Sequence, residues 1–194
     1  MVVALQSPVT LAGIAFDDSD LARLSRNTSG GFNVSMFFDG SDAGLTTNAE
    51  AIDVVTGLAD GSWLISTRGS GAVSGVSSFS AEDILRFRPT SLGTTTAGSW
   101  SLYADMSDVG ITGTSENITA VDVAADGRIF LTTSGNIGAT TGGTSVSGTN
   151  EDVVVFQPTT LGSTTTGSYP SPLFFDGSLH GLGRNALLGI DVPV

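Results

Sequence analysis

The chain has 194 residues, of which 40% are hydrophobic and only 13% are charged, so it can form a core while uncharged polar side chains supply most of its polar surface. It contains no cysteine, which excludes disulfides, thiolate metal sites and cysteine nucleophiles. The formal net charge of −12 repels nucleic acid phosphates and anionic lipid, and no stretch approaches the roughly 18 apolar residues of a membrane span. We therefore expect neither nucleic-acid binding nor membrane insertion by this chain.

The N-terminal region contains two apolar runs, Val9–Phe16 and Leu21–Arg26. The segment around the second run, Asp18–Asn27, has a weak helical period, but it aligns with the strand-like segment Ala81–Thr90. We therefore predict a strand at Leu21–Arg26 and almost no helix in the chain.

The next region has four runs of strand length that are rich in β-branched or aromatic residues. They are Val34–Phe38, Ala51–Leu58, Ser62–Thr67 and Asp83–Arg88. Asp60-Gly61 joins the second run to the third, as Asp126-Gly127 does later in the chain, and Asp-Gly between apolar runs predicts a hairpin with a type I′ turn. Pro89 and Pro158 are expected to end the fourth run of their repeats, because proline lacks a backbone donor.

The same pattern then recurs along the chain. "FFDGSDAGL" at Phe37–Leu45 returns as "YADMSDVGI" at Tyr103–Ile111 and as "FFDGSLHGL" at Phe174–Leu182. The segment Glu82–Trp100 returns at Glu151–Tyr169 with its acidic pair, its Pro-Thr and its run of threonines.

The repeat predicts one all-β domain over residues 1–194, built from four-stranded antiparallel repeats like the blades of a β-propeller. The repeats span about residues 34–99, 100–169, and 170–194 together with 1–33. Strands from both chain ends are expected to complete the third repeat, with Val9–Phe16 and Ala186–Val194 in one sheet. Since propellers usually have about four to eight blades, three arrangements stay open: a piece of a longer ring, two chains that make about six blades, or three sheets packed as a prism or barrel.

The recurring motif "FDGSDxGL … DGxxLxST … EDIxRFxPTSLGxTTAGxW" resembles repeats of large secreted bacterial proteins of β-propeller type, most of them uncharacterised. The resemblance covers about Val34–Val192. It implies an extracytoplasmic location, whether periplasmic, at the cell surface or secreted, and a structural or binding role, but it names no substrate.

Acidic loops are the strongest candidates for a site. The first two copies place two aspartates close together with a glutamate beyond, at Asp39, Asp42, Glu50, Asp105, Asp108 and Glu116. Ca²⁺ takes several carboxylate and carbonyl oxygens, so it is the candidate ion, although the spacing is not that of an EF-hand. The third copy has Leu179 in place of the second aspartate and Asn185 in place of the glutamate. The alternative is that the acids cap turns by accepting hydrogen bonds from nearby backbone N–H groups.

The other polar and aromatic candidates favour structural roles. The pairs Glu82-Asp83 and Glu151-Asp152 would point to opposite faces of a strand, and a role such as pairing with Arg86, Arg88 or Arg128 suits them better than catalysis. The single histidine, His180, lacks a nucleophile motif around it. The aromatics could form a carbohydrate-stacking platform, but bulky residues at equivalent positions more often fill a core; they are Trp63, Phe87, Trp100, Tyr103, Phe156 and Tyr169.

Because polar features repeat and no unique catalytic cluster is evident, the sequence favours a non-enzymatic, extracytoplasmic scaffold or docking subunit without a cofactor. Its partner would be another protein or a further copy of itself. Two alternatives stay open. One is a Ca²⁺-dependent propeller hydrolase of the lactonase kind, and the other is a lectin-like module that binds carbohydrate.

Overall fold

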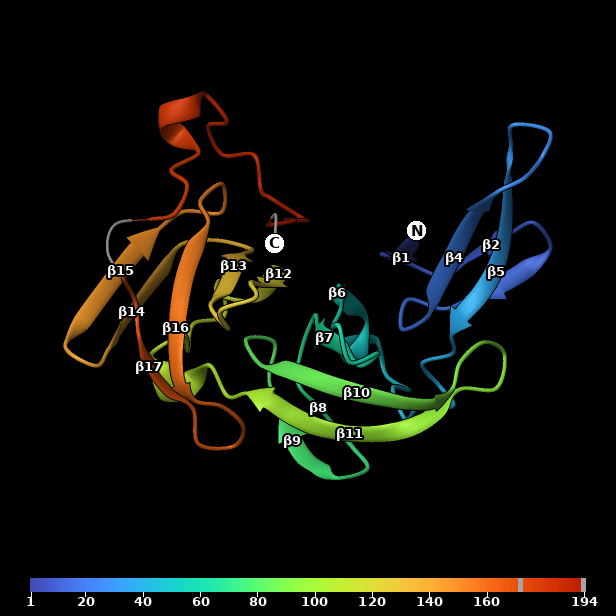
Figure 1. Ribbon diagram of the computed structural model, residues 1–194, viewed down its shortest axis with the longest axis horizontal. Helices are drawn as coiled ribbons and strands as arrows, with labels where there is room; N and C mark the ends of the chain where they lie inside the picture. The colour runs from blue at the N-terminus through green and yellow to red at the C-terminus, as the bar shows by residue number, and fades with distance from the viewer. Residues whose placement is uncertain (171–172, 193–194) are drawn as a thin grey trace. The chain divides into compact units, whose positions relative to one another are not determined.

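The computed structural model describes residues 1–170 and 173–192, and Figure 1 shows their strands and turns. The described chain is built from β-strands, with three short 3₁₀ turns at Asn48–Glu50, Ser107–Val109 and Ser178–His180. The predicted all-β class is therefore confirmed. Within the described residues, no helix is long and apolar enough to cross a membrane.

The strands of the described residues form one three-stranded and two four-stranded sheets, and three separate hairpins. The first sheet has the order β1-β4-β5 and contains Val2–Ala4, Leu21–Arg26 and Phe32–Phe38. The second has the order β11-β10-β7-β6, and its strands β6, β7, β10 and β11 are Ile52–Gly57, Trp63–Thr67, Ile84–Ser91 and Ala97–Ala104. The third has the order β12-β13-β16-β17, with Ile118–Val123, Ile129–Thr133, Val154–Thr160 and Thr166–Ser168. The strand predicted at Leu21–Arg26 is thus present as β4.

A two-stranded hairpin is inserted at the same place in each repeat, before the strand that follows the acidic pair or its counterpart. The hairpins are β2–β3 (Val9–Leu11 and Ile14–Phe16), β8–β9 (Gly71–Val73 and Val76–Phe79) and β14–β15 (Ile137–Thr141 and Thr144–Gly148). The four runs predicted for the first two repeats are thus present as strands, whereas residues 173–192, expected to help complete the third repeat, contain no strand. The hairpin is an addition that the sequence pattern did not reveal.

The chain divides into two compact units. Unit 1 contains Met1–Ser80 and Arg86–Ser101, and unit 2 contains Ala81–Leu85 and Leu102–Val194. In unit 1 the rings of Phe38, Phe87 and Trp100 pack together with centroids 4.7–6.1 Å apart. In unit 2 Phe156 and Tyr169 pack at 5.3 Å. Phe87 and Phe156 are equivalent bulky positions of the repeat, as are Trp100 and Tyr169, and all four lie in the core.

The two Asp-Gly hairpins are present, but their turns differ from the predicted type. Gly61 and Gly127 have φ of 82° and 84°, whereas the preceding aspartates do not have positive φ. A type I′ turn needs positive φ at both central residues, so these are longer loops with one left-handed glycine. Asp60 supports the first loop by accepting hydrogen bonds from the Ser62 backbone N–H at 3.1 Å and from the Ser62 hydroxyl at 2.6 Å.

The prediction that proline ends the fourth run is wrong. Strand β10 continues through Pro89 to Ser91, and β16 continues through Pro158 to Thr160. In β16 the pairing with β17 shifts register between Pro158 and Thr160. This irregularity lets the strand accommodate a residue that has no N–H to donate.

The predicted shared sheet of Val9–Phe16 and Ala186–Val194 is also not found in the described part of the chain. Val9–Phe16 pairs with itself as β2 and β3, and residues 186–192 contain no strand. Residues 193–194 lie outside the described residues. The reason is local: the Ala12-Gly13 turn has left-handed φ at both residues, which folds this run back on itself.

Candidate functional site: the acidic loops

The first acidic loop follows β5 in unit 1. Asp39 Oδ1 accepts hydrogen bonds from the Ser41 hydroxyl at 2.7 Å and from the Asp42 backbone N–H at 3.2 Å. Asp42 Oδ2 accepts from the backbone N–H of Thr96 at 3.0 Å, and the Thr96 hydroxyl accepts from the Asp39 backbone N–H at 2.9 Å. The Asp42 carboxylate and the Asp39 backbone N–H therefore hold the loop against the Thr96 turn between β10 and β11, while the Asp39 carboxylate caps the loop itself.

The second acidic loop follows β11 and repeats this geometry within unit 2. Asp105 Oδ1 accepts from the Ser107 hydroxyl at 2.6 Å and from its backbone N–H at 3.2 Å. Asp108 Oδ2 accepts from the Thr165 backbone N–H at 2.9 Å, and the Thr165 hydroxyl accepts from the Asp105 backbone N–H at 2.9 Å. The two loops thus make the same contacts with two different threonine turns.

The third loop keeps only part of this arrangement. Asp176 Oδ1 accepts from the Ser178 hydroxyl at 2.6 Å and from the Leu179 backbone N–H at 3.2 Å. These two hydrogen bonds hold the pKa of Asp176 below its usual value. Leu179 replaces the second aspartate and is 80% exposed.

Glu50 and Glu116 follow the first two acidic loops in the chain, and both side chains are buried. Glu50 Oε2 accepts from the backbone N–H groups of Thr46 at 2.8 Å and Thr47 at 2.9 Å. Burial alone would raise the pKa of Glu50, but these donors and the Thr47 hydroxyl outweigh it and hold the pKa below its usual value. Glu116 Oε2 accepts from the Thr112 backbone N–H at 2.8 Å, and its Oε1 accepts from Gly138 at 2.9 Å. Glu50 Oε1 also accepts from the Ala72 backbone N–H of β8 at 3.4 Å, so each glutamate joins the loop to the inserted hairpin.

A second set of buried aspartates holds the start of each acidic loop. Each accepts from the backbone N–H of the residue that follows the first loop aspartate: Asp20 from Gly40 at 2.9 Å, Asp83 from Met106 at 3.2 Å and Asp152 from Gly177 at 2.9 Å. Burial, with the negative charges of Asp39 and Asp17, raises the pKa of Asp20. The sequence revealed the acidic pairs but not this role, although the alignment of Asp18–Asn27 with Ala81–Thr90 contained the signal.

The acidic pairs do not act as units. Asp152 caps the loop, while its neighbour Glu151 is buried with an Oε2 atom that has no hydrogen-bond partner among the described residues. Of the arginines proposed to pair with these acids, Arg86 instead contacts Asp60, and Arg128 contacts Asp126 at 2.8 Å. The expectation that the two acids of a pair point to opposite faces of a strand is wrong, because both pairs lie in the turns that precede β10 and β16, where Glu151 and Asp152 are both buried.

The six predicted metal-ligand residues are thus all placed as acceptors for hydrogen bonds. Across residues 1–170 and 173–192, no group of three or more His, Cys, Asp or Glu side chains is arranged to hold a metal ion. The turn-capping alternative accounts for the contacts that these side chains make. Calcium binding stays a prediction that only a metal titration tests.

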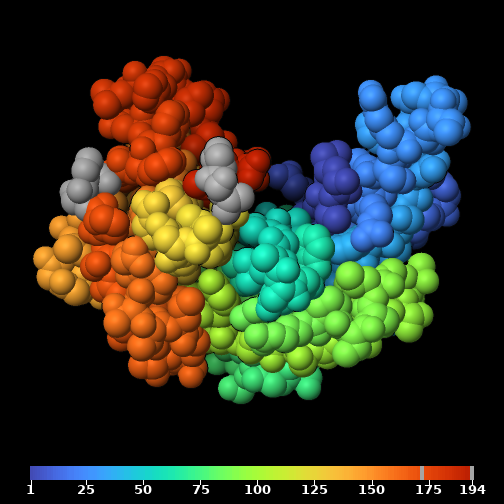
Figure 2. All heavy atoms as spheres, viewed as in Figure 1, coloured from blue at the N-terminus to red at the C-terminus, as the bar shows by residue number. Residues whose placement is uncertain are grey.

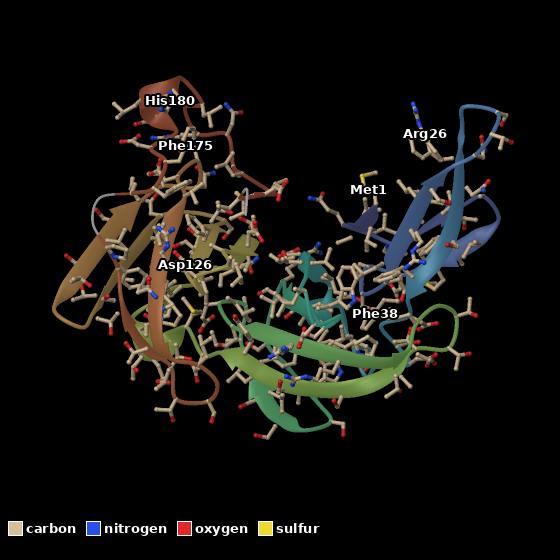
Figure 3. The ribbon with its side chains drawn as sticks, viewed as in Figure 1. Met1, Arg26, Phe38, Asp126, Phe175 and His180 are labelled. Carbon is tan, nitrogen blue, oxygen red and sulfur yellow. The ribbon has the colours of Figure 1, made fainter. Side chains whose placement is uncertain are left out.

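The aromatic and histidine candidates occupy structural positions. The Trp100 indole N–H donates to the Ala43 carbonyl at 2.8 Å, and the Tyr169 hydroxyl donates to the equivalent Val109 carbonyl at 3.1 Å. Both side chains are buried, which removes them from any exposed sugar-stacking surface. His180 is exposed and stacks on Phe175 with ring centroids 4.9 Å apart, as Figure 3 shows.

Together these contacts describe acidic loops that are held by the same hydrogen bonds in successive repeats. No family model, no curated protein and no solved structure matches the chain.

Proposed function

We propose that the protein is a non-enzymatic, extracytoplasmic β-repeat module that acts as a scaffold or docking subunit in a protein assembly. The observation that carries this proposal is the repetition of the polar contacts. The Asp42–Thr96 contact recurs as Asp108–Thr165, with the same atoms and nearly the same distances. A catalytic site needs different groups that converge on one substrate, whereas a repeated contact serves each repeat in the same way.

The fold that we propose with this function is propeller-like, with each four-stranded sheet as one blade. The sheets β6-β7-β10-β11 and β12-β13-β16-β17 both place their strands side by side in chain order, as propeller blades do. The acidic loops connect β5 to β6 and β11 to β12, and each loop is hydrogen-bonded to a threonine turn between the last two strands of a four-stranded sheet. The extracytoplasmic location rests on the resemblance of the repeat motif to secreted bacterial proteins.

The test measures the rival activities directly. The purified chain is assayed against a panel of esters and lactones with and without Ca²⁺, and on a glycan array. We expect no turnover above the buffer blank and no glycan signal. Ca²⁺-dependent turnover that Glu50→Gln abolishes and Glu82→Gln retains would overturn the proposal, because Glu50 is a predicted metal ligand and Glu82 is not. A saturable glycan signal would favour the lectin alternative instead.

A further inference from the structure

Strand β1 is the edge of a sheet that is one strand smaller than its counterparts. In the larger sheets β10 lies between β11 and β7, and β16 lies between β17 and β13; in the first sheet β4 lies between β5 and β1. The registers show that β1 corresponds to β13. Val3 of β1 pairs with Ala22 of β4, and Leu131 of β13 pairs with Val154 of β16, which is the position equivalent to Ala22. Strand β12 lies beyond β13, but no strand lies beyond β1 in the part of the chain that the structure describes.

The C-terminal segment Leu187–Val192 is the counterpart of β6 and β12. The first residue of each donates its backbone N–H to a carbonyl two residues before a buried capping aspartate. These hydrogen bonds are Ile52 to Asp18 at 3.0 Å, Ile118 to Ala81 at 3.3 Å, and Leu187 to Asn150 at 3.0 Å. The segment also has the length of β6 and β12, which contain 6 residues each. Its Ile190-Asp191-Val192 corresponds to Val121-Asp122-Val123 of β12.

This segment is held on its own unit and forms no strand there. The hydroxyls of Thr119 and Thr132 both donate to the Leu187 carbonyl at 3.1 Å. Ile190 and Val192 pack against a cluster of Phe130, Val153 and Val155. In Figure 2 the red residues near the C-terminus lie over the yellow and orange part of the same unit. The segment is therefore positioned as a sheet strand whose neighbouring strand is not supplied by unit 2.

The register of the pairing follows from the third sheet. There Val121 of β12 lies opposite Leu131 of β13. Since Ile190 corresponds to Val121 and Val3 corresponds to Leu131, Ile190 is expected opposite Val3. Met1 is 73% exposed and Leu188 is 62% exposed. Large exposed apolar side chains are typical of surfaces that another chain covers, so both ends of the chain fit a contact of this kind.

We propose that the C-terminal segment Leu187–Val192 of one copy pairs antiparallel with β1 of a second copy, with Ile190 opposite Val3. Each copy gives one segment and receives one, so two copies close head to tail and leave neither β1 edge open. A ring of two chains brings the number of sheets into the usual propeller range of about four to eight. The proposal rests on the docking role above and names its partner as the chain itself.

The test uses cysteine cross-linking, which is clean because the native chain has no cysteine. Val3→Cys and Ile190→Cys are made as single variants with different tags, mixed, and oxidised. Paired residues of antiparallel strands have Cα atoms roughly 4.5–5.5 Å apart, which is within disulfide reach. The matched control mixes Val3→Cys with Leu188→Cys, which is more exposed but two residues out of register.

We expect a disulfide-linked dimer that carries both tags, formed in several-fold higher yield by the first mixture than by the control. We also expect light scattering to give twice the mass of one chain, and Ile190→Pro to return it to one. Far-UV circular dichroism, which reports the strands of both units, checks that the Ile190→Pro chain is folded. A mass of one chain for the native protein overturns the proposal. So does a double variant that forms only an internal disulfide, because the segment then closes on its own chain. These results leave docking to a different protein intact, whereas enzymatic turnover would overturn that role without affecting the copy pairing.

Discussion

The turn-capping role of Glu50 predicts a large and pH-dependent loss of stability in Glu50→Gln. Glu50 is 4% exposed, and its carboxylate accepts from two backbone N–H groups and from the Thr47 hydroxyl at 2.8–3.0 Å. Hydrogen bonds to a charged group contribute about 1.5–3 kcal/mol each, against about 0.5–1.5 for neutral pairs. The glutamine oxygen can keep these partners, so each of the two backbone contacts loses about 1 kcal/mol. In the native protein the Ala72 backbone N–H donates to the second carboxylate oxygen. In the variant the glutamine NH₂ group takes the place of that oxygen, so two donors face each other and the hydrogen bond is lost. We therefore expect a total loss of about 2–4 kcal/mol.

The stability that the Glu50 carboxylate contributes should depend on pH in a known direction. Its hydrogen-bond donors outweigh burial and hold the pKa of Glu50 below its usual value in the folded protein, so the carboxylate contributes its full stability above that usual pKa. This contribution is lost as the pH falls through the lowered folded pKa. The gap between native protein and variant should therefore be full at neutral pH and shrink in strongly acidic solution.

The assay is urea unfolding followed by tryptophan fluorescence. Both tryptophans, Trp63 and Trp100, lie in unit 1 together with Glu50, so the signal reports the unit that is perturbed. Glu82→Gln is the matched control; because Glu82 lies in unit 2, its unfolding is followed by far-UV circular dichroism, and its free energy of unfolding should change by less than about 0.5 kcal/mol. An unchanged urea midpoint in Glu50→Gln, or a difference that stays constant into acid, would refute the capping argument.

Three further outcomes follow from the structure. Gly127→Val should lose about 1–2 kcal/mol in urea unfolding because φ is 84° there, while Gly138→Val, in open space at an ordinary φ, should be near neutral; equal effects would contradict this. Tyr169→Phe should lose about 1–2 kcal/mol by far-UV circular dichroism, since it leaves the Val109 carbonyl without the buried hydroxyl donor. Ca²⁺ and Mg²⁺ at equal ionic strength should raise the melting temperature equally by screening the charge of −12; a rise with Ca²⁺ alone that Asp39→Asn removes would instead show a specific site.

Most strands of the four-stranded sheets could be predicted because their apolar runs are long and β-branched, but β17 (Thr166–Ser168) is short and polar and no predicted run covers it. Strand β4 came from alignment with the later copy, since its own composition has a weak helical period. The inserted hairpins could not be predicted in the same way. Segments such as Gly71–Phe79 contain small and polar residues and short apolar runs, and they are stabilised by contacts with distant residues such as Glu50.

The candidate site shows why carboxylate spacing alone is ambiguous. A metal ion and a turn both take carboxylate oxygens in loops rich in glycine and serine, so Asp39 and Asp42 fit either role in the sequence. The difference lies in donors from far along the chain. The Thr96 backbone N–H reaches Asp42 only because the β10–β11 turn folds back on the loop, and no local pattern contains that information.

The third repeat gives independent support to closure between chain ends. In the first two loops an aspartate accepts a hydrogen bond from a threonine turn, Asp42 from Thr96 and Asp108 from Thr165. In the third repeat both the aspartate and the threonine turn are replaced. Leu179 stands where Asp42 and Asp108 stand, and the turn between β4 and β5 is a short loop around Asn27 that satisfies its own donors at Ser29 and Gly31. An aspartate without its threonine turn would lose a partner, and a buried threonine N–H without its aspartate would cost about 1–3 kcal/mol. Joint loss of the aspartate and the threonine turn is what we expect if they face each other in one contact. Exposed Leu179 and Phe32, at 80% and 57%, are the apolar replacements that such a contact between copies would cover.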